Sequence, residues 1–254
     1  MEQENKKQKT AFFRFFELWL QSFWMLVPIN FIYFVISALL LPVGLAQAGI
    51  TNVTRNIARQ RHSFGVSDFF DTIKANWKQS LIAGIINMLV SLALCFGILF
   101  YYNSVGIVAD IGLGFLLMCF AVFAFMGYYI WFMIITFDLP VSKIYKNSFL
   151  LAFVNLKNNL LLGVAQLALY APLILVAILI PHFVVLFLCM IVAVFILPGF
   201  INLLIQFTIF PAIQTHMLDP YYEAHPEEDI SLRQSLSLKT DAQSDEKTVP
   251  VFHD

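Results

Sequence analysis

Apolar residues dominate five long stretches of the chain, and polar residues gather in the connections between them. Residues 80–101, 106–137 and 159–210 together contain one Asp, one His and no Lys, Arg or Glu. A run of about 20 apolar residues spans the ~30 Å hydrocarbon core of a bilayer as a helix. The pattern therefore predicts an all-α integral membrane protein, a polytopic helical bundle with clear spans at residues 22–42, 80–102, 106–137, 159–180 and 182–210.

The basic residues argue for a sixth crossing at residues 43–58. The connections 59–79 and 138–158 carry several Lys and Arg, whereas 102–106 and 180–182 carry none, so the first two should be cytoplasmic. With five spans, the basic segment 1–11 would then lie outside. A sixth span places both termini in the cytoplasm. The alternative is a five-span protein in which residues 43–58 lie at the membrane interface.

An internal repeat supports the six-span interpretation. The motif NWKQSLxxG at residues 76–84 recurs as NLKNNLxxG at residues 155–163, an offset of 79 residues. At the same offset, residues 43–58 align with residues 122–137, which have the apolar character of a span. Each copy would hold an inward helix, a basic linker and an outward helix.

Residues 66–79, which run into the first copy of the motif, have the pattern of an amphipathic helix. Ser67 is a candidate N-cap, and Phe69, Phe70, Ile73 and Trp77 share one face. We expect this face to lie on the membrane surface.

Charge is distributed unevenly along the 254 residues, of which 60% are hydrophobic and 12% charged. Residues 1–218 hold 12 Lys and Arg against 7 Asp and Glu, whereas residues 219–254 hold 3 against 9. We therefore expect one membrane domain at residues 12–210 and an acidic, disordered cytoplasmic tail at residues 211–254.

Two sets of residues are candidates for function. Polar side chains within the predicted spans either join helices, which we favour, or line a polar path; they are Asn30, Gln47, Asn52, Asn87, Asp110, Gln166, Asn202 and Gln206. Asn87 and Gln166 occupy matching repeat positions. Basic residues either set the topology or contact lipid headgroups or a partner; they are Arg55, Arg59, Arg61, Lys74 and Lys78.

Motifs for catalysis are not recognisable in the sequence. Cys95, Cys119 and Cys189 lie in apolar segments, and the five His residues show no metal-ligand spacing. We expect a protein that is not an enzyme, with no cofactor, no metal site and no nucleic-acid partner.

Three segments carry a family resemblance: FFRFFELW at 12–19, residues 42–58 followed by Arg59 (ending TRNIAR), and SDFFDTIKANWKQSL at 67–81. In these the chain resembles the YesL-like family of bacterial membrane proteins, and more loosely so as far as residue 210. The resemblance implies five or six spans in the bacterial cell membrane and an undefined activity. It also implies genes often encoded near carbohydrate ABC importers and polysaccharide-degrading enzymes. The family has no established catalytic residues to carry over.

Three functions follow as hypotheses. The first, which we favour, is an accessory or regulatory component of carbohydrate uptake that contacts the permease subunits of an ABC importer. The second is an autonomous small-solute transporter or channel. The third is a membrane enzyme or lipid-handling protein, which would need a clustered polar pocket at the interface.

Overall fold

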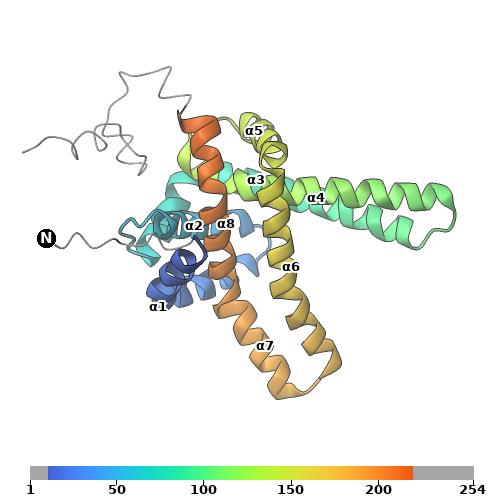
Figure 1. The fold of residues 1–254 in the computed structure, drawn as a ribbon, viewed down its shortest axis with the longest axis horizontal. Coiled ribbons are helices and arrows are strands. Elements are labelled where there is room, and N and C mark those ends of the chain that lie inside the picture. Colours follow the sequence, from blue (N-terminus) through green and yellow to red (C-terminus); the bar gives the residue numbers. More distant parts are fainter. Residues whose placement is uncertain (1–10, 220–254) are drawn as a thin grey trace, which may run out of the picture. The chain divides into compact units, whose positions relative to one another are not determined.

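The computed structural model describes residues 11–219, and over this range it is built from helices without strands (Figure 1). The elements in chain order are α1 (Ala11–Ser37), α2 (Val43–Ala58), α3 (Val66–Tyr102), α4 (Ile107–Thr136), α5 (Val141–Val154), α6 (Leu156–Leu179), α7 (Phe183–Phe195), α8 (Leu197–Ile213) and a final π-helical turn (Gln214–Leu218). The chain divides into two units, residues 1–209 and 210–254.

Five helical segments within the described residues are long and apolar enough to cross a membrane: Phe12–Ser37, Val66–Tyr102, Ile107–Thr136, Leu156–Leu179 and Phe183–Leu218. They match the five clear spans and confirm the polytopic helical prediction. Helix α2 forms at the expected residues 43–58, but its 16 residues reach only about 24 Å. A sixth crossing therefore stays a prediction.

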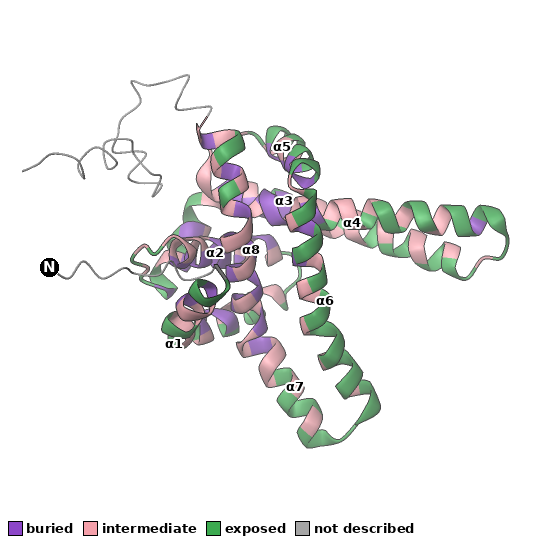
Figure 2. Ribbon diagram, viewed as in Figure 1, coloured by how far each residue is buried: buried purple, intermediate pink, exposed green. Residues whose placement is uncertain are grey.

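The core of the first unit forms around α2, whose small residues allow close packing. Gly44 of α2 meets Gly84 and the carbonyl of Ser80 on α3 at backbone contact distance, so that neither glycine has room for a side chain. Gly49, one turn later, lies directly against the Phe69 ring. Figure 2 shows the buried residues gathered on α2 and the helix faces around it. The cluster of buried apolar residues around α2 comprises Phe15, Leu18, Leu26, Ile29, Ala46, Ile50, Val53, Ile57, Phe69 and Leu203.

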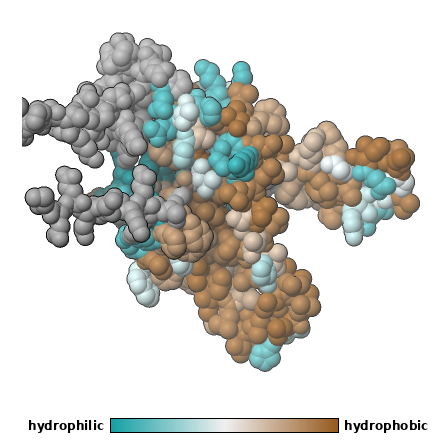
Figure 3. Space-filling view, viewed as in Figure 1, coloured by the Kyte–Doolittle hydropathy of each residue, from teal (hydrophilic) through white to brown (hydrophobic). Residues whose placement is uncertain are grey.

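The outer parts of the helical hairpins α3–α4 and α6–α7 are exposed and apolar. Figure 2 colours them mainly as exposed, and the space-filling view shows a predominantly hydrophobic surface there (Figure 3). Leu99, Ile107, Leu167 and Phe183 are each more than half exposed. In water such a surface would be an aggregation hazard, but lipid tails cover it at no cost.

The backbone departs from helical geometry at matching positions of the two repeated motifs. Asn76 interrupts α3 with φ −116° and ψ 15°, and Asn155, 79 residues later, separates α5 from α6 with φ −105° and ψ 31°. Both asparagines begin the repeated motif. In each copy an amphipathic helix therefore bends into a membrane span at the same position.

Helix boundaries differ from the predicted ones at three places. Helix α1 ends at Ser37 rather than at residue 42, and the span expected at 182–210 is interrupted at Ile196. Pro198 contributes to this break because it has no N–H to donate to the carbonyl of Val194. The tail expected to be disordered from residue 211 is helical as far as Leu218. The remainder of the tail, and the segment 1–10, lie outside the described residues.

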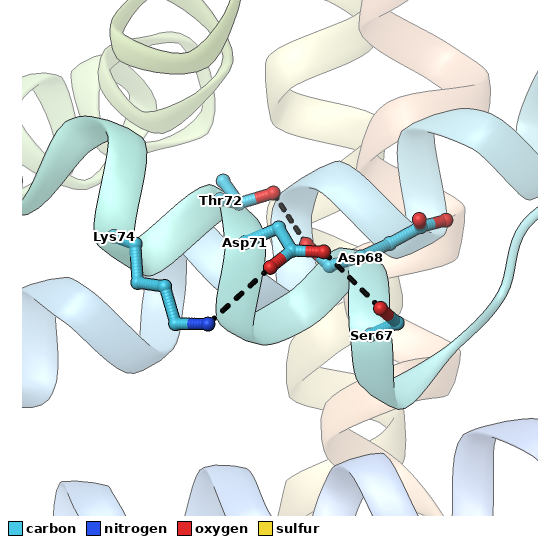
Figure 4. A network of polar contacts seen from close by, with 5 residues as sticks. All are labelled: Ser67, Asp68, Asp71, Thr72 and Lys74. Carbon is cyan, nitrogen blue, oxygen red and sulfur yellow. Dashed lines mark hydrogen bonds and ion pairs between the residues drawn. The ribbon is translucent and has the colours of Figure 1, made fainter.

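Ser67 is not the N-cap of α3, because the helix begins at Val66 and the cap position is Gly65 with φ +62°. The carboxylate of Asp68 organises this end of the helix instead, accepting hydrogen bonds from the Ser63 hydroxyl at 2.8 Å and the Phe64 N–H at 2.9 Å. Ser67 donates to Asp71 inside the helix at 3.1 Å (Figure 4). The prediction failed because several polar residues near the turn compete for the capping role.

We expect single-cysteine labelling to decide the sixth crossing. In a chain whose native cysteines are replaced by alanine, Leu41→Cys lies between α1 and α2. A membrane-impermeant maleimide should label it from outside the cell if α2 crosses the membrane, and only after lysis if it does not. Val105→Cys, at a fully exposed position in the α3–α4 loop, serves as the external reference, and His62→Cys serves as the internal one. Protection of Leu41→Cys alongside labelling of Val105→Cys would refute the six-span topology.

Candidate functional site

A cavity of about 380 Å³ lies between α2, α3 and α4. Its lining is mostly apolar, with the polar side chains of Gln47, Asn87 and Ser91 among aromatic residues such as Phe123 and Trp131. The contact between Gly44 and Gly84 closes α2 against α3 beside it. The structure thus brings two predicted residues, Gln47 and Asn87, from different helices to one cavity.

Asn87 is held in place from α5. The Tyr145 hydroxyl donates to Asn87 Oδ1 at 2.9 Å and approaches the carbonyl of Ala83 at 3.2 Å. Burial raises the pKa of Tyr145 to about 12, so the hydroxyl keeps its proton at neutral pH and remains a donor. This contact links α5, the amphipathic helix of the second repeat copy, to α3, which contains a span of the first copy.

Gln47 belongs to a hydrogen-bonded chain that joins three helices. The Tyr33 hydroxyl of α1 donates to Gln47 Oε1 at 2.9 Å, and Gln47 Nε2 donates to Asn202 Oδ1 of α8 at 2.8 Å. Asn202 Nδ2 in turn donates to the carbonyl of Pro198 at 2.9 Å. Both the oxygen and the nitrogen of the Gln47 amide are therefore hydrogen-bonded to neighbouring helices.

Asn30 fastens α1 to the break between α7 and α8. Its Nδ2 donates to the carbonyl of Phe195 at 2.7 Å, one of the carbonyls exposed where the helix is interrupted. A Cβ at Gly199 would lie 2.7 Å from Asn30 Oδ1, so the glycine is what admits the amide. Gln206, one turn after Asn202, is buried, and its Oε1 has no hydrogen-bond partner among the described residues.

Arg55 and Asn52 form a second group of contacts at the other end of α2. The Arg55 guanidinium donates from Nη1 to the Thr136 hydroxyl at 2.7 Å and the carbonyl of Ile135 at 3.2 Å, and from Nη2 to Asn52 Oδ1 at 2.7 Å. Asn52 Nδ2 donates to Thr72 at 2.7 Å. Arg55 thus caps the C-terminus of α4, where a cation is favoured. The sequence left two roles open for Arg55, setting the topology or contacting a lipid or partner; in the structure both terminal nitrogens donate hydrogen bonds within the chain.

The other two arginines lie just beyond the end of α2. The Arg59 guanidinium stacks on the Phe132 ring, with 5.2 Å between the guanidinium carbon and the ring centroid. Burial, with the charges of Arg55 and Arg61, lowers the pKa of Arg59 to about 9, so the side chain stays protonated at neutral pH. Arg61 is half-buried at the mouth of a small cavity with Gln21 and Ser63.

A third group of contacts joins α4, α5 and α6. The Tyr128 hydroxyl donates to Gln166 Oε1 at 3.1 Å. The neighbouring Tyr129 hydroxyl donates to Asn159 Oδ1 at 2.8 Å and accepts from Asn155 Nδ2 at 3.0 Å. Gln166 therefore serves as a helix contact, and it does not share a cavity lining with its repeat partner Asn87.

The remaining predicted residues are exposed. Asp110 lies in the first turn of α4, where the helix dipole favours a carboxylate. Lys74 forms an ion pair with Asp71 at 3.5 Å, drawn in Figure 4, and Lys78 Nζ lies 5.6 Å from the Trp77 ring centroid. The predicted residues are thus distributed among separate groups of contacts rather than along one polar path.

Sequence reasoning missed the tyrosines that complete these groups: Tyr33, Tyr128, Tyr129 and Tyr145. A signal was available, because a buried Tyr hydroxyl within an apolar segment needs a hydrogen-bond partner. What the pattern lacked was the identity of that partner, since each tyrosine donates to an amide between 14 and 58 positions away.

Comparison with known proteins yields one family. Residues 26–98 match a family described as a protein of unknown function, DUF624. The match covers the last part of α1, the whole of α2 and most of α3, including Gln47, Asn87 and the glycine contact. No curated protein and no solved structure matches the chain.

Proposed function

We propose that this protein is a non-enzymatic membrane component that assists carbohydrate uptake by contacting the permease subunits of an ABC importer. The proposal joins the resemblance to the YesL-like family with one structural observation. Amide side chains on the apolar helices form hydrogen bonds with neighbouring helices, as in the series from Tyr33 through Gln47 to Asn202. Such contacts favour a fixed helical scaffold over a moving solute path.

Apolar helix surface and exposed lysines would provide the contacts with a partner. The α3–α4 and α6–α7 hairpins present long apolar faces to the bilayer, where another membrane helix can pack. On α5, Lys143 and Lys146 are exposed, and both lie in the connection predicted to be cytoplasmic. These two lysines are the basic positions of α5 available to an acidic surface of a partner.

Cross-linking in native membranes tests the proposal. Affinity purification after mild cross-linking should recover an ABC permease and its solute-binding protein. Lys143→Glu combined with Lys146→Glu should reduce that recovery at least about fivefold, because each reversal repels an acidic partner. Arg14→Glu, an exposed charge on α1, is the matched control and should leave recovery unchanged. Recovery of this chain alone, as monomer or homo-oligomer, would contradict the proposal.

The cavity between α2, α3 and α4 supports a second candidate, an autonomous transporter or channel for a small solute. In that case Asn87→Ala should abolish flux in liposomes without loss of assembly. Gln166→Ala is the control, since it removes the same chemical group at the matching repeat position but outside the cavity. Equal flux in the two variants and in the native chain would exclude this cavity as a path.

A further inference from the structure

A second, more polar cavity of about 600 Å³ lies where α3 bends and α4 ends. Its lining includes Lys74, Asn76 and Lys78 from α3, and Thr136 and Asp138 from the end of α4. None of the groups of contacts described above accounts for a pocket whose lining includes two lysines and an aspartate.

The walls of this cavity are held in place. On one side Arg55 binds the Ile135 carbonyl and the Thr136 hydroxyl, which fixes the last turn of α4. On the other side Gln79 Nε2 donates to the carbonyl of Leu139 at 3.1 Å, which ties α3 to the segment after α4. The irregular backbone at Asn76 leaves the space between them.

The charged groups of the cavity are available to a ligand. Lys74 and Asp71 form an ion pair, but their side chains are 77% and 66% exposed, and such a pair holds weakly. Lys78 and Asp138 are also exposed. The cavity therefore offers two cations and one anion, a pattern complementary to a ligand that carries a phosphate and an ammonium group.

The position of the cavity along the predicted membrane spans indicates the class of ligand. The candidate span of α4 ends at Thr136, and the apolar part of α3 begins just after the bend. Trp77, half exposed beside the cavity, is the residue type that marks the headgroup level of a bilayer. Phe70 and its repeat counterpart Phe149 are exposed on the amphipathic helices. At this level the abundant phosphate-bearing molecules are phospholipids.

We propose that the cavity binds the headgroup of phosphatidylethanolamine, with Lys74 and Lys78 facing the phosphate and Asp138 facing the primary ammonium. An anionic headgroup such as phosphatidylglycerol has no cation for Asp138. The trimethylammonium of phosphatidylcholine has no N–H to donate to it. The inference does not depend on a role in carbohydrate uptake.

Native mass spectrometry of the full-length protein in mild detergent tests the proposal. The probes are phosphatidylethanolamine, phosphatidylglycerol and phosphatidylcholine with the same acyl chains, supplied in equal amounts. The native chain should retain phosphatidylethanolamine over each of the others. Asp138→Asn should lower phosphatidylethanolamine retention about fivefold and raise that of phosphatidylglycerol. Lys74→Gln combined with Lys78→Gln should lower retention of all three lipids, about fivefold for each lysine.

Lys143→Gln combined with Lys146→Gln is the matched control, because these exposed lysines of α5 do not line the cavity. The proposal would be overturned if this control lost as much lipid as the Lys74 and Lys78 variant. It would also be overturned if Asp138→Asn left the ratio of bound phosphatidylethanolamine to bound phosphatidylglycerol unchanged. Addition of millimolar inorganic phosphate distinguishes a phospholipid headgroup from a free phosphate ion as the ligand. Displacement of the lipid by phosphate alone would assign the site to a soluble anion and would also overturn it.

Discussion

Replacing Gly44 by leucine is expected to lower the free energy of unfolding by about 3 kcal/mol or more. The backbones of α2 and α3 touch at Gly44, Gly84 and the Ser80 carbonyl, where even a Cβ atom has no space. Backbone cannot rotate aside as a long side chain can, so the two helices must separate. The core around Ile50 and the cavity at Gln47 would be disrupted with them.

Unfolding by SDS in mixed micelles measures this effect. Gly114→Leu is the matched control, because a Cβ added at this exposed position on α4 meets nothing within 4 Å. It should leave the free energy of unfolding within about 1 kcal/mol of the native value, since a helix-interior glycine is itself slightly unfavourable. Equal stability of the two variants would show that the glycine contact is not the point at which α2 and α3 are joined.

Replacing Arg55 by alanine should lower the free energy of unfolding by about 2–4 kcal/mol. The guanidinium joins α2 to the end of α4 and to Asn52, and its removal leaves the Ile135 carbonyl without this donor. Arg55→Lys should recover only part of the loss, because a single ammonium cannot reproduce donors that point toward two helices.

A double-mutant cycle with Thr136→Val isolates the contact. The two substitutions should couple by about 1–2 kcal/mol, whereas substitutions at independent sites add. Lys74→Ala, which removes an exposed ion pair, should change stability by no more than about 0.5 kcal/mol. Additive effects of Arg55→Ala and Thr136→Val would show that the contact between these two side chains does not contribute to the stability.

The membrane spans could be predicted because hydrocarbon imposes one rule on every crossing segment. A helix that faces lipid must be apolar over about 20 residues, whatever its neighbours are. The repeated motif was equally visible, and its two asparagines mark the bend within α3 and the break between α5 and α6. In the structure, Asn30, Gln47 and Gln166 each form a hydrogen bond with a neighbouring helix.

The pairings of these amides could not be predicted. A sequence shows which residues share a face of one helix, but the helix that covers that face is chosen by packing. Asn87 matches Gln166 in the repeat, yet Asn87 lines a cavity and binds Tyr145, while Gln166 binds Tyr128. Arg55 and Arg59 looked alike as basic residues near the membrane, and only the placement of α4 distinguishes their contacts.

The helical, membrane-spanning character of this chain follows from its sequence alone, because the cost of polar groups in hydrocarbon acts on each segment independently. The tertiary structure decided where the cavities lie and which charged groups reach them. Lys74 and Asp138 are 64 positions apart and become neighbours of one cavity only when the bend in α3 meets the end of α4. Long-range packing of that kind depends on shape complementarity between helices, which no local pattern of residues records.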